Sequence, residues 1–238
     1  MATESSSPRV GGIPSAINRR LLVAVTTVGL ALGFWYLLGS IYPQNLMPYP
    51  STVFLGVWEL HASGILYEHL VASVWRILWA FVGAFIIGGI IGVIAGLSDF
   101  GSKLTSPYVV IGFSIPTVVW AAMTTLMFGF EFLAPVSATV LGTVPYIATN
   151  IEKGIENIDT NLIRMSRSFE IGRFRMFRRV LIPNIAPALF GAARIGLSIS
   201  YKIMAVAEMF AASSGIGYMI YTTFSQYNFA STWAWGLV

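Results

Sequence analysis

Long uninterrupted apolar segments, separated by short polar ones, dominate the chain. Within each segment the apolar residues follow one another instead of alternating with polar ones, which is typical of helices and not of a membrane barrel. Each segment is also about as long as a helix must be to cross the hydrocarbon core of a bilayer. The pattern therefore predicts an all-α membrane protein. The predicted spans run over about 21–42, 72–97, 107–128 (interrupted by Pro116), 133–151 and 185–207.

The residues before the first span predict a flexible arm. Residues 1–18 are rich in Ser, Pro and Gly without an apolar period, which is typical of disorder. Arg19 and Arg20 then precede the first charge-free run. This run is too long for a cleaved signal sequence, and no small-residue cleavage site follows it at the right place. We therefore interpret it as a retained first span.

Polar or glycine-rich segments connect the spans. After the first span, Pro48 and Pro50 lead into a short amphipathic helix that Ser51 is expected to cap. With the remaining segments, the pattern predicts about six transmembrane helices in a single domain over 19–238. Those segments are a polar turn at 99–103, a re-entrant or surface segment at 208–231, and at 233–238 the start of a sixth helix that is incomplete at its C-terminal end.

The second span carries closely spaced glycines. Small residues let two helices approach closely in lipid, where packing rather than exclusion of water drives their association. We therefore expect this helix to use its glycines as a packing face. They are Gly83, Gly88, Gly89, Gly92 and Gly96.

Composition agrees with a membrane location. The chain is 56% hydrophobic and only 10% charged, whereas soluble domains carry about a quarter charged residues. Its pI of about 9.5 is compatible with nucleic-acid binding, but the basic residues gather beside apolar segments, as membrane topology requires. The chain has no cysteine, so thiol chemistry and a thiolate metal site are excluded, and its two histidines, His61 and His69, cannot build a metal site by themselves.

One polar segment, 152–183, interrupts the apolar pattern. Together with the N-terminal residues up to Arg20 and with Lys103, it holds eleven of the fourteen lysines and arginines. Because such residues accumulate on the cytoplasmic side, we expect the N-terminus and this segment to be cytoplasmic. Its arginines are Arg164, Arg167, Arg173, Arg175, Arg178 and Arg179.

The same segment has the pattern of a docking helix. Leu162, Met165 and Phe169, with Arg173 one turn further, share a helix face. A short apolar face flanked by arginines fits the cleft of a cytoplasmic partner. The alternative is an amphipathic helix that lies on anionic lipid.

Polar residues also follow one face of the fifth span. Arg194, Ser198, Tyr201 and Lys202 recur at helical spacing in an otherwise apolar segment. A charge inside a span costs about 2.5–3.5 kcal/mol at the bilayer centre, so such residues face a partner or a wet cavity. This stripe predicts one lining of a translocation pathway.

Two questions about the lining stay open at this stage. Lys202 either attracts an anionic cargo, or pairs with Glu208 or reaches the outer interface. On the third span, Ser114, Pro116, Thr117 and Trp120 either line the pathway or form only a proline kink and a packed aromatic ring.

Several short motifs, in a fixed order, resemble one family. The chain looks like the membrane permease subunits of bacterial ABC importers, in the branch that takes up nitrate, sulfonates, taurine and bicarbonate. The resemblance extends over 21–235. Its motifs are LMPYPSTV (46–53), HLVASVWRILWAF (69–81), SIPTVVW (114–120), MFGF (127–130), FRRVLIPNIAP (177–187) and AVAEMFAASSGIGYMI (205–220).

The resemblance implies a fold, a location and partners. We expect a type I permease fold in the bacterial plasma (inner) membrane and a second permease subunit, as a homodimer or alternatively a heterodimer. Two ATP-binding subunits would bind ATP–Mg, so this chain itself would need no cofactor. A solute-binding protein would deliver the cargo, and membrane lipid would surround the helices.

The resemblance also assigns residues. The cytoplasmic loop would couple to the ATPase, but its usual Glu-Ala-Ala opening is replaced here by Arg164, Met165 and Ser166, and Gly172 stands two positions late. An external gate would contain Glu208, Gly215 and Gly217. The coupling-loop residues are Asn161, Leu162, Arg164, Met165, Ser166, Phe169, Glu170, Gly172 and Phe174.

These observations predict a pore-forming permease that passes a small anionic solute by alternating access. An enzyme is disfavoured because the sequence has no phosphate loop, metal cluster or nucleophile–base pair. A secondary transporter would need carboxylates within the spans for ion coupling. The five predicted spans contain no carboxylate away from their ends. The altered opening of the coupling loop keeps one alternative open, a degenerate partner permease in a heteromeric complex.

Overall fold

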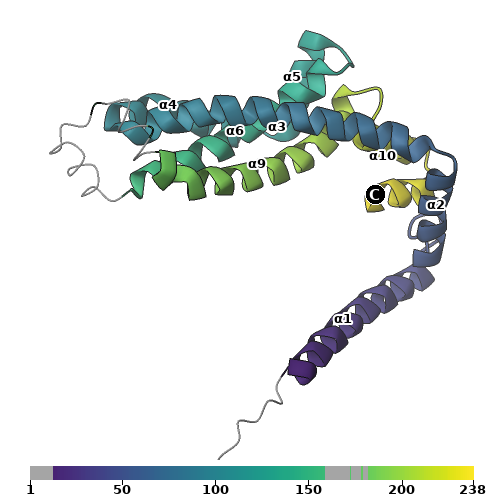
Figure 1. The fold of residues 1–238 in the computed structure, drawn as a ribbon. Coiled ribbons are helices and arrows are strands. Elements are labelled where there is room, and N and C mark those ends of the chain that lie inside the picture. Colours follow the sequence, from purple (N-terminus) through teal and green to yellow (C-terminus); the bar gives the residue numbers. More distant parts are fainter. Residues whose placement is uncertain (1–12, 159–171, 173–177, 179–181) are drawn as a thin grey trace, which may run out of the picture.

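The computed structural model describes residues 13–158 and 182–238, together with Gly172 and Arg178. These residues fold into helices joined by short turns (Figure 1). The helices are α1 (Ile13–Ile41), α2 (Pro50–Ala62), α3 (Ile65–Leu97), α4 (Asp99–Ser114), α5 (Thr117–Phe128), α6 (Leu133–Glu156), α9 (Ile182–Ala211), α10 (Ile216–Ser225) and α11 (Phe229–Leu237).

Helices α3, α6 and α9 run side by side and form the core of the bundle (Figure 1). Side chains of α6 fill the space between its two neighbours: Ile147, Ile151 and Ile155 are buried together with Ala84 of α3 and Ala192 of α9. The predicted glycine face of the second span is confirmed, because Gly88, Gly92 and Gly96 lie against α6 too closely for any larger residue.

Within the described part of the chain, three helices are long and apolar enough to cross a membrane by themselves: α3, α9 and the part of α1 from Arg19. The bent pair α4 and α5 would make a fourth span. Helix α6 starts at Leu133, where a span was predicted. It falls outside this set, since it is buried between other helices and its surface can be less apolar. The predicted number of about six spans therefore stays a prediction.

Helix α1 leads away from the bundle (Figure 1). It begins at Ile13, within the segment 1–18 that was predicted to be an arm, and the boundary between arm and domain stays a prediction. Helix α2 begins at Pro50 with Tyr49 as its N-cap. The predicted cap at Ser51 is wrong, because proline fits the first helical position, where no backbone N–H is needed.

Two other boundaries also differ from the prediction. Helix α3 begins at Ile65, not near residue 72. The predicted polar turn at 99–103 is the first turn of α4, which Ser98 caps by accepting a hydrogen bond of 3.0 Å from the Gly101 N–H. A single residue thus joins two helices, because Ser98 supplies both the chain reversal and the cap.

The C-terminal part consists of short helices packed near α2 and α9. Helix α9 extends to Ala211, α10 follows after a turn, and α11 contains Trp233, where a sixth span was predicted to start. The segment 208–231, predicted as re-entrant or on the surface, contains the end of α9 with Glu208, all of α10 and the first residues of α11.

Candidate functional site

The polypeptide breaks sharply between α4 and α5. Ile115 and Pro116 have extended backbone, and the axes of the two helices differ by 96°. Pro116 cannot continue α4 because it lacks an N–H and its ring restricts the residue before it. The predicted interruption at Pro116 is confirmed.

A hollow of about 320 Å³ lies at this break. Pro116 and Thr117 line one side of it, and Lys202 of α9 lines the other. The structure thus brings together residues that were predicted on two different spans. The complete lining is Gly112, Phe113, Ile115, Pro116, Thr117, Gly142, Tyr146, Ile199, Lys202 and Ile203.

Of the described residues that line this hollow, Lys202 is the only charged one. Among the residues that the structure describes, no carboxylate forms an ion pair with it. The alternative in which Lys202 pairs with Glu208 is wrong, because Glu208 pairs with Arg76. An ammonium group beside aromatic and aliphatic side chains can hold an anionic group whose remainder is apolar.

The polar stripe on α9 is present as predicted. Arg194, Ser198, Tyr201 and Lys202 are all exposed, whereas the opposite face of the helix is buried. The stripe does not form one site, since Tyr201 lines a second hollow of about 260 Å³ while Lys202 lines the hollow at the break. Its role in translocation stays a prediction.

Ser114 and Trp120 do not belong to the hollow at the break. The Ser114 hydroxyl donates to the Val110 carbonyl within its own helix. Trp120 packs against a cluster of small residues, among them Ala138 of α6 and Ala207 of α9. For Trp120 the structure therefore supports the packed aromatic ring.

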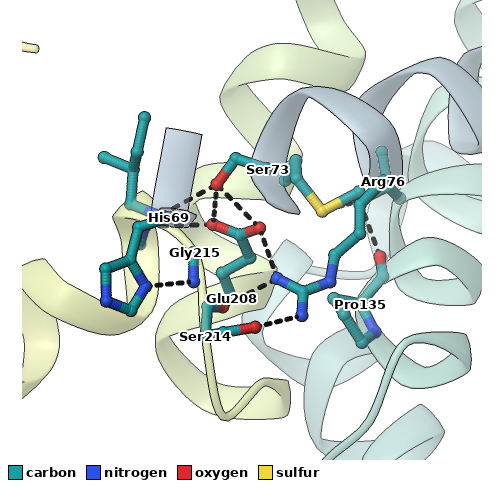
Figure 2. A network of polar contacts seen from close by, with 11 residues as sticks. His69, Ser73, Arg76, Pro135, Glu208, Ser214 and Gly215 are labelled. Atoms are coloured by element: carbon teal, nitrogen blue, oxygen red, sulfur yellow. Dashed lines mark hydrogen bonds and ion pairs between the residues drawn. The ribbon is translucent and has the colours of Figure 1, made fainter. Parts of the chain in front are cut away.

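A buried polar network ties α3 to the turn before α10 (Figure 2). At its centre, Arg76 Nη1 lies 2.9 Å from Glu208 Oε1, and both side chains are buried. Ser73 donates to the same carboxylate at 2.7 and 2.9 Å. We call this network, which comprises His69, Ser73, Arg76, Glu208 and residues 214–217, the α3–α10 joint.

The glycines predicted for the gate belong to this joint. Gly215 has a φ of 108°, which only glycine adopts without strain, and a Cβ there would collide with the Glu208 carboxylate. A Cβ on Gly217 would collide with the Ala205 carbonyl. The predicted grouping of Glu208, Gly215 and Gly217 is thus a grouping in space, and the Glu208 side chain is buried within it.

Sequence reasoning missed His69, Ser73 and Arg76 as functional candidates. A signal was present, because a charged residue within an apolar span requires a partner. The three residues also recur at helical spacing on α3, and a search for a carboxylate near a span end would have led to Glu208. The predicted coupling-loop residues lie outside the described residues, except for Gly172, which is exposed.

The chain is similar in sequence to a family of known transport proteins. The model of the family "Binding-protein-dependent transport system inner membrane component" matches residues 88–238. The chain belongs to this family. It is 34% identical over 187 residues to SsuC, a candidate aliphatic sulfonates transport permease of Escherichia coli, covering 78% of this chain and 71% of SsuC.

One further sequence relative and one solved structure are similar to the chain. The riboflavin transport system permease protein RibX of Chloroflexus aurantiacus is 32% identical over 216 residues, covering 90% of this chain and 80% of RibX. A chain of the inward-facing MetNI methionine ABC transporter superimposes with a TM-score of 0.64 at 23% identity, covering 73% of this chain and 87% of the other. The similarity to MetNI concerns the fold alone.

The predicted family is therefore confirmed. The chain is an ABC importer permease of the nitrate, sulfonate and taurine branch and a multi-pass protein of the bacterial inner membrane. Permeases of this kind work with separate ATP-binding subunits and with a solute-binding protein.

Proposed function

We propose that this permease passes a small organic anion from its solute-binding protein to the cytoplasm by alternating access. Two permease subunits, identical copies in the simplest case, would enclose the pathway between them. The cytoplasmic segment 152–183 would transmit the closure of the ATP-binding subunits to the membrane helices. Rigid-body rocking of one bundle against the other is a common way to make such a switch.

The observation that carries the anionic cargo is Lys202 at the break between α4 and α5. Its charge faces a hollow that is otherwise lined by uncharged residues, among them Phe113 and Tyr146. Such a lining suits a sulfonate or a comparable anion on a short apolar body. Relatives named for aliphatic sulfonates and for riboflavin both exist, so the family alone does not fix the charge of the cargo, and Lys202 is the feature that favours an anion.

Uptake by the complete transporter tests this proposal. Proteoliposomes would contain the permease with its cognate ATP-binding subunits, and radiolabelled ethanesulfonate would be supplied with the loaded binding protein. Riboflavin would be the competing cargo. We expect Lys202→Gln to lower ethanesulfonate uptake by about ten- to a hundredfold, because a charged hydrogen bond contributes about 1.5–3 kcal/mol.

Two control variants complete the design. Lys202→Arg keeps the charge and should retain most of the uptake, and Lys103→Gln removes a lysine that does not line this hollow. Equal uptake by wild type and Lys202→Gln would refute the anionic cargo, and transport of riboflavin alone would do so as well.

A further inference from the structure

The first turn of α10 is capped by residues far away in the sequence. The first backbone N–H groups of a helix have no partner within the helix, and a side chain at the N-cap usually accepts from one of them. Here the N-cap is Gly215, which has no side chain. The N–H groups of Gly215, Ile216 and Gly217 must therefore find acceptors elsewhere.

Each of these three N–H groups has its own acceptor in the α3–α10 joint. Gly215 donates to His69 Nδ1 at 3.0 Å, and Ile216 donates to Ser73 Oγ at 2.8 Å. Gly217 donates to Glu208 Oε2 at 3.0 Å. The carboxylate thus lies at the N-terminus of α10, where the helix dipole favours a negative charge.

Arg76 holds the same turn through its other groups. Its Nη1 donates to the Ser214 carbonyl and its Nη2 to the Ser214 hydroxyl, each at 2.7 Å. His69, Ser73 and Arg76 stand at positions i, i+4 and i+7 of α3 and therefore share one helix face. One face of α3 consequently binds four consecutive residues of the chain, with the help of Glu208.

Both oxygens of the Glu208 carboxylate have hydrogen-bond donors within the joint. Glu208 Oε1 accepts from Ser73 and Arg76, and Oε2 accepts from Ser73 and Gly217. Donors from the chain itself thus occupy this carboxylate. Buried ion pairs of this kind often contribute little net stability. A geometrical role explains the pair better than a role in stability or in ion coupling.

The joint also borders the hollow that the pathway stripe reaches. Ser73 and Glu208 form part of its wall, with Tyr201 and Met204 of α9 and Ile220 of α10. A displacement of α10 would therefore open this hollow next to Tyr201.

We propose that His69, Ser73, Arg76 and Glu208 are positioning residues that make α10 move with α3 as one body during transport. This inference rests on the proposed function. When the joint is broken, α10 no longer follows α3, so the signal from a loaded binding protein fails to reach the ATP-binding subunits. Binding of the cargo and assembly of the complex would both persist.

The first test compares coupling with assembly in the complete transporter. In Glu208→Gln, the amide nitrogen cannot accept from Arg76 or Gly217, although the side chain keeps its shape. We expect the ratio of stimulated to basal ATPase activity to fall by about tenfold, within the usual range of allosteric coupling. Assembly with the ATP-binding subunits should be unchanged. Glu59→Gln, at an exposed position of α2, is the matched control.

A double variant separates positioning from stability. Arg76→Met combined with Glu208→Leu replaces the pair by apolar side chains, a change that often preserves stability. We expect this variant to assemble and to remain uncoupled. Normal coupling in the double variant would overturn the proposal. If the double variant fails to assemble, Ser73→Ala is used in its place, because it removes only one acceptor and one donor. Full coupling in Ser73→Ala would overturn the proposal equally.

A labelling experiment distinguishes failure of this inference from failure of the proposed function. The chain contains no cysteine, and Met204 is fully buried in the wall of the hollow. A thiol introduced by Met204→Cys should react with a water-soluble maleimide about tenfold faster when Glu208→Gln is added, which requires no cargo. Unchanged labelling would overturn the inference. A different outcome is faster labelling in the Glu208→Gln background together with no cargo-stimulated ATPase activity in the wild type. This outcome would support the inference about the joint and refute the proposed function.

Discussion

Single glycines on α3 set the distance between α3 and α6. A Cβ on Gly88 would lie 2.9 Å from both the Cβ of Ile147 and the carbonyl oxygen of Val144. Gly92 and Gly96 repeat this contact one and two turns further on, against Ile151 and Ile155. Such contacts replace the hydrophobic effect, which does not drive helices together in lipid.

Gly88→Leu should therefore destabilise the permease. Inserting a larger side chain into a closely packed interface costs about 1–3 kcal/mol, and here the nearest atoms include backbone, which cannot rotate away. Thermal unfolding of the detergent-purified protein would show a lower midpoint. The control is Gly33→Leu on α1, where a Cβ meets nothing within 4 Å. An equal midpoint for both variants would contradict this explanation.

At this scale the sequence predicted the type of residue better than its partner. The glycines of the second span and the polar stripe with Arg194 and Lys202 were identified correctly. The partner of Glu208 was missed, because Arg76 and Glu208 are separated by 132 positions. Spacing along one helix gives no information about contacts between helices.

Among the elements, α1 differs most from the others. Its apolar part, Arg19–Ile41, has none of its window buried by the rest of the described chain. Its ring contacts with other described residues lie near its C-terminal end, where Tyr36 stacks on Tyr49 and Trp35 lies against Trp233. A helix that is apolar on all sides and lies outside the bundle must be covered by lipid or by another subunit.

We expect α1 to be surrounded by hydrocarbon in a bilayer. A nitroxide label at Val28, which is 58% exposed, should be accessible to oxygen and inaccessible to a water-soluble nickel chelate. A label at Ile151, which is 1% exposed, should be protected from both reagents. High accessibility of the Val28 label to the chelate would show that α1 is not a membrane span.

The boundaries of the helices could be predicted only where composition changes. The start of α6 at Leu133 was predicted because a polar turn precedes it. The starts of α3 and α4 were not predicted, because the first turns of both helices contain polar or charged residues. These are Tyr67 and Glu68 in α3, and Asp99 and Lys103 in α4. Helical ends depend on caps such as Ser98, which a hydropathy pattern does not detect.

For the whole molecule, membership of the family implies a complex of the permease with ATP-binding subunits and a solute-binding protein. The structure gives the helices that enclose the hollows, whereas the predicted docking element 162–174 lies outside the described residues except for Gly172. It connects α6, which ends at Glu156, to α9, which begins at Ile182. Both are core helices, so a force applied to this segment would reach the centre of the bundle directly.

Phe169→Arg should remove the ATP-binding subunits from the complex. In our proposal Phe169 contributes to the apolar face of the docking helix, and a charge in a desolvated interface costs several kcal/mol. Co-purification with the ATP-binding subunits and their ATPase activity would be measured together. Arg175→Gln, in the same segment but off that face, is the control. Unchanged assembly and turnover in Phe169→Arg would favour the lipid-bound helix or the heteromeric complex.

The joint between α3 and α10 also imposes an order on biogenesis. His69 is synthesised 146 residues before Gly215, the residue whose N–H it accepts. Until the ribosome has passed Gly217, Arg76 and Glu208 lack part of their hydrogen-bond partners, and an incompletely paired buried charge is costly. A nascent chain that stops earlier thus carries an unsatisfied polar site in its apolar interior. We therefore expect unfinished chains to be less stable in the membrane than complete ones.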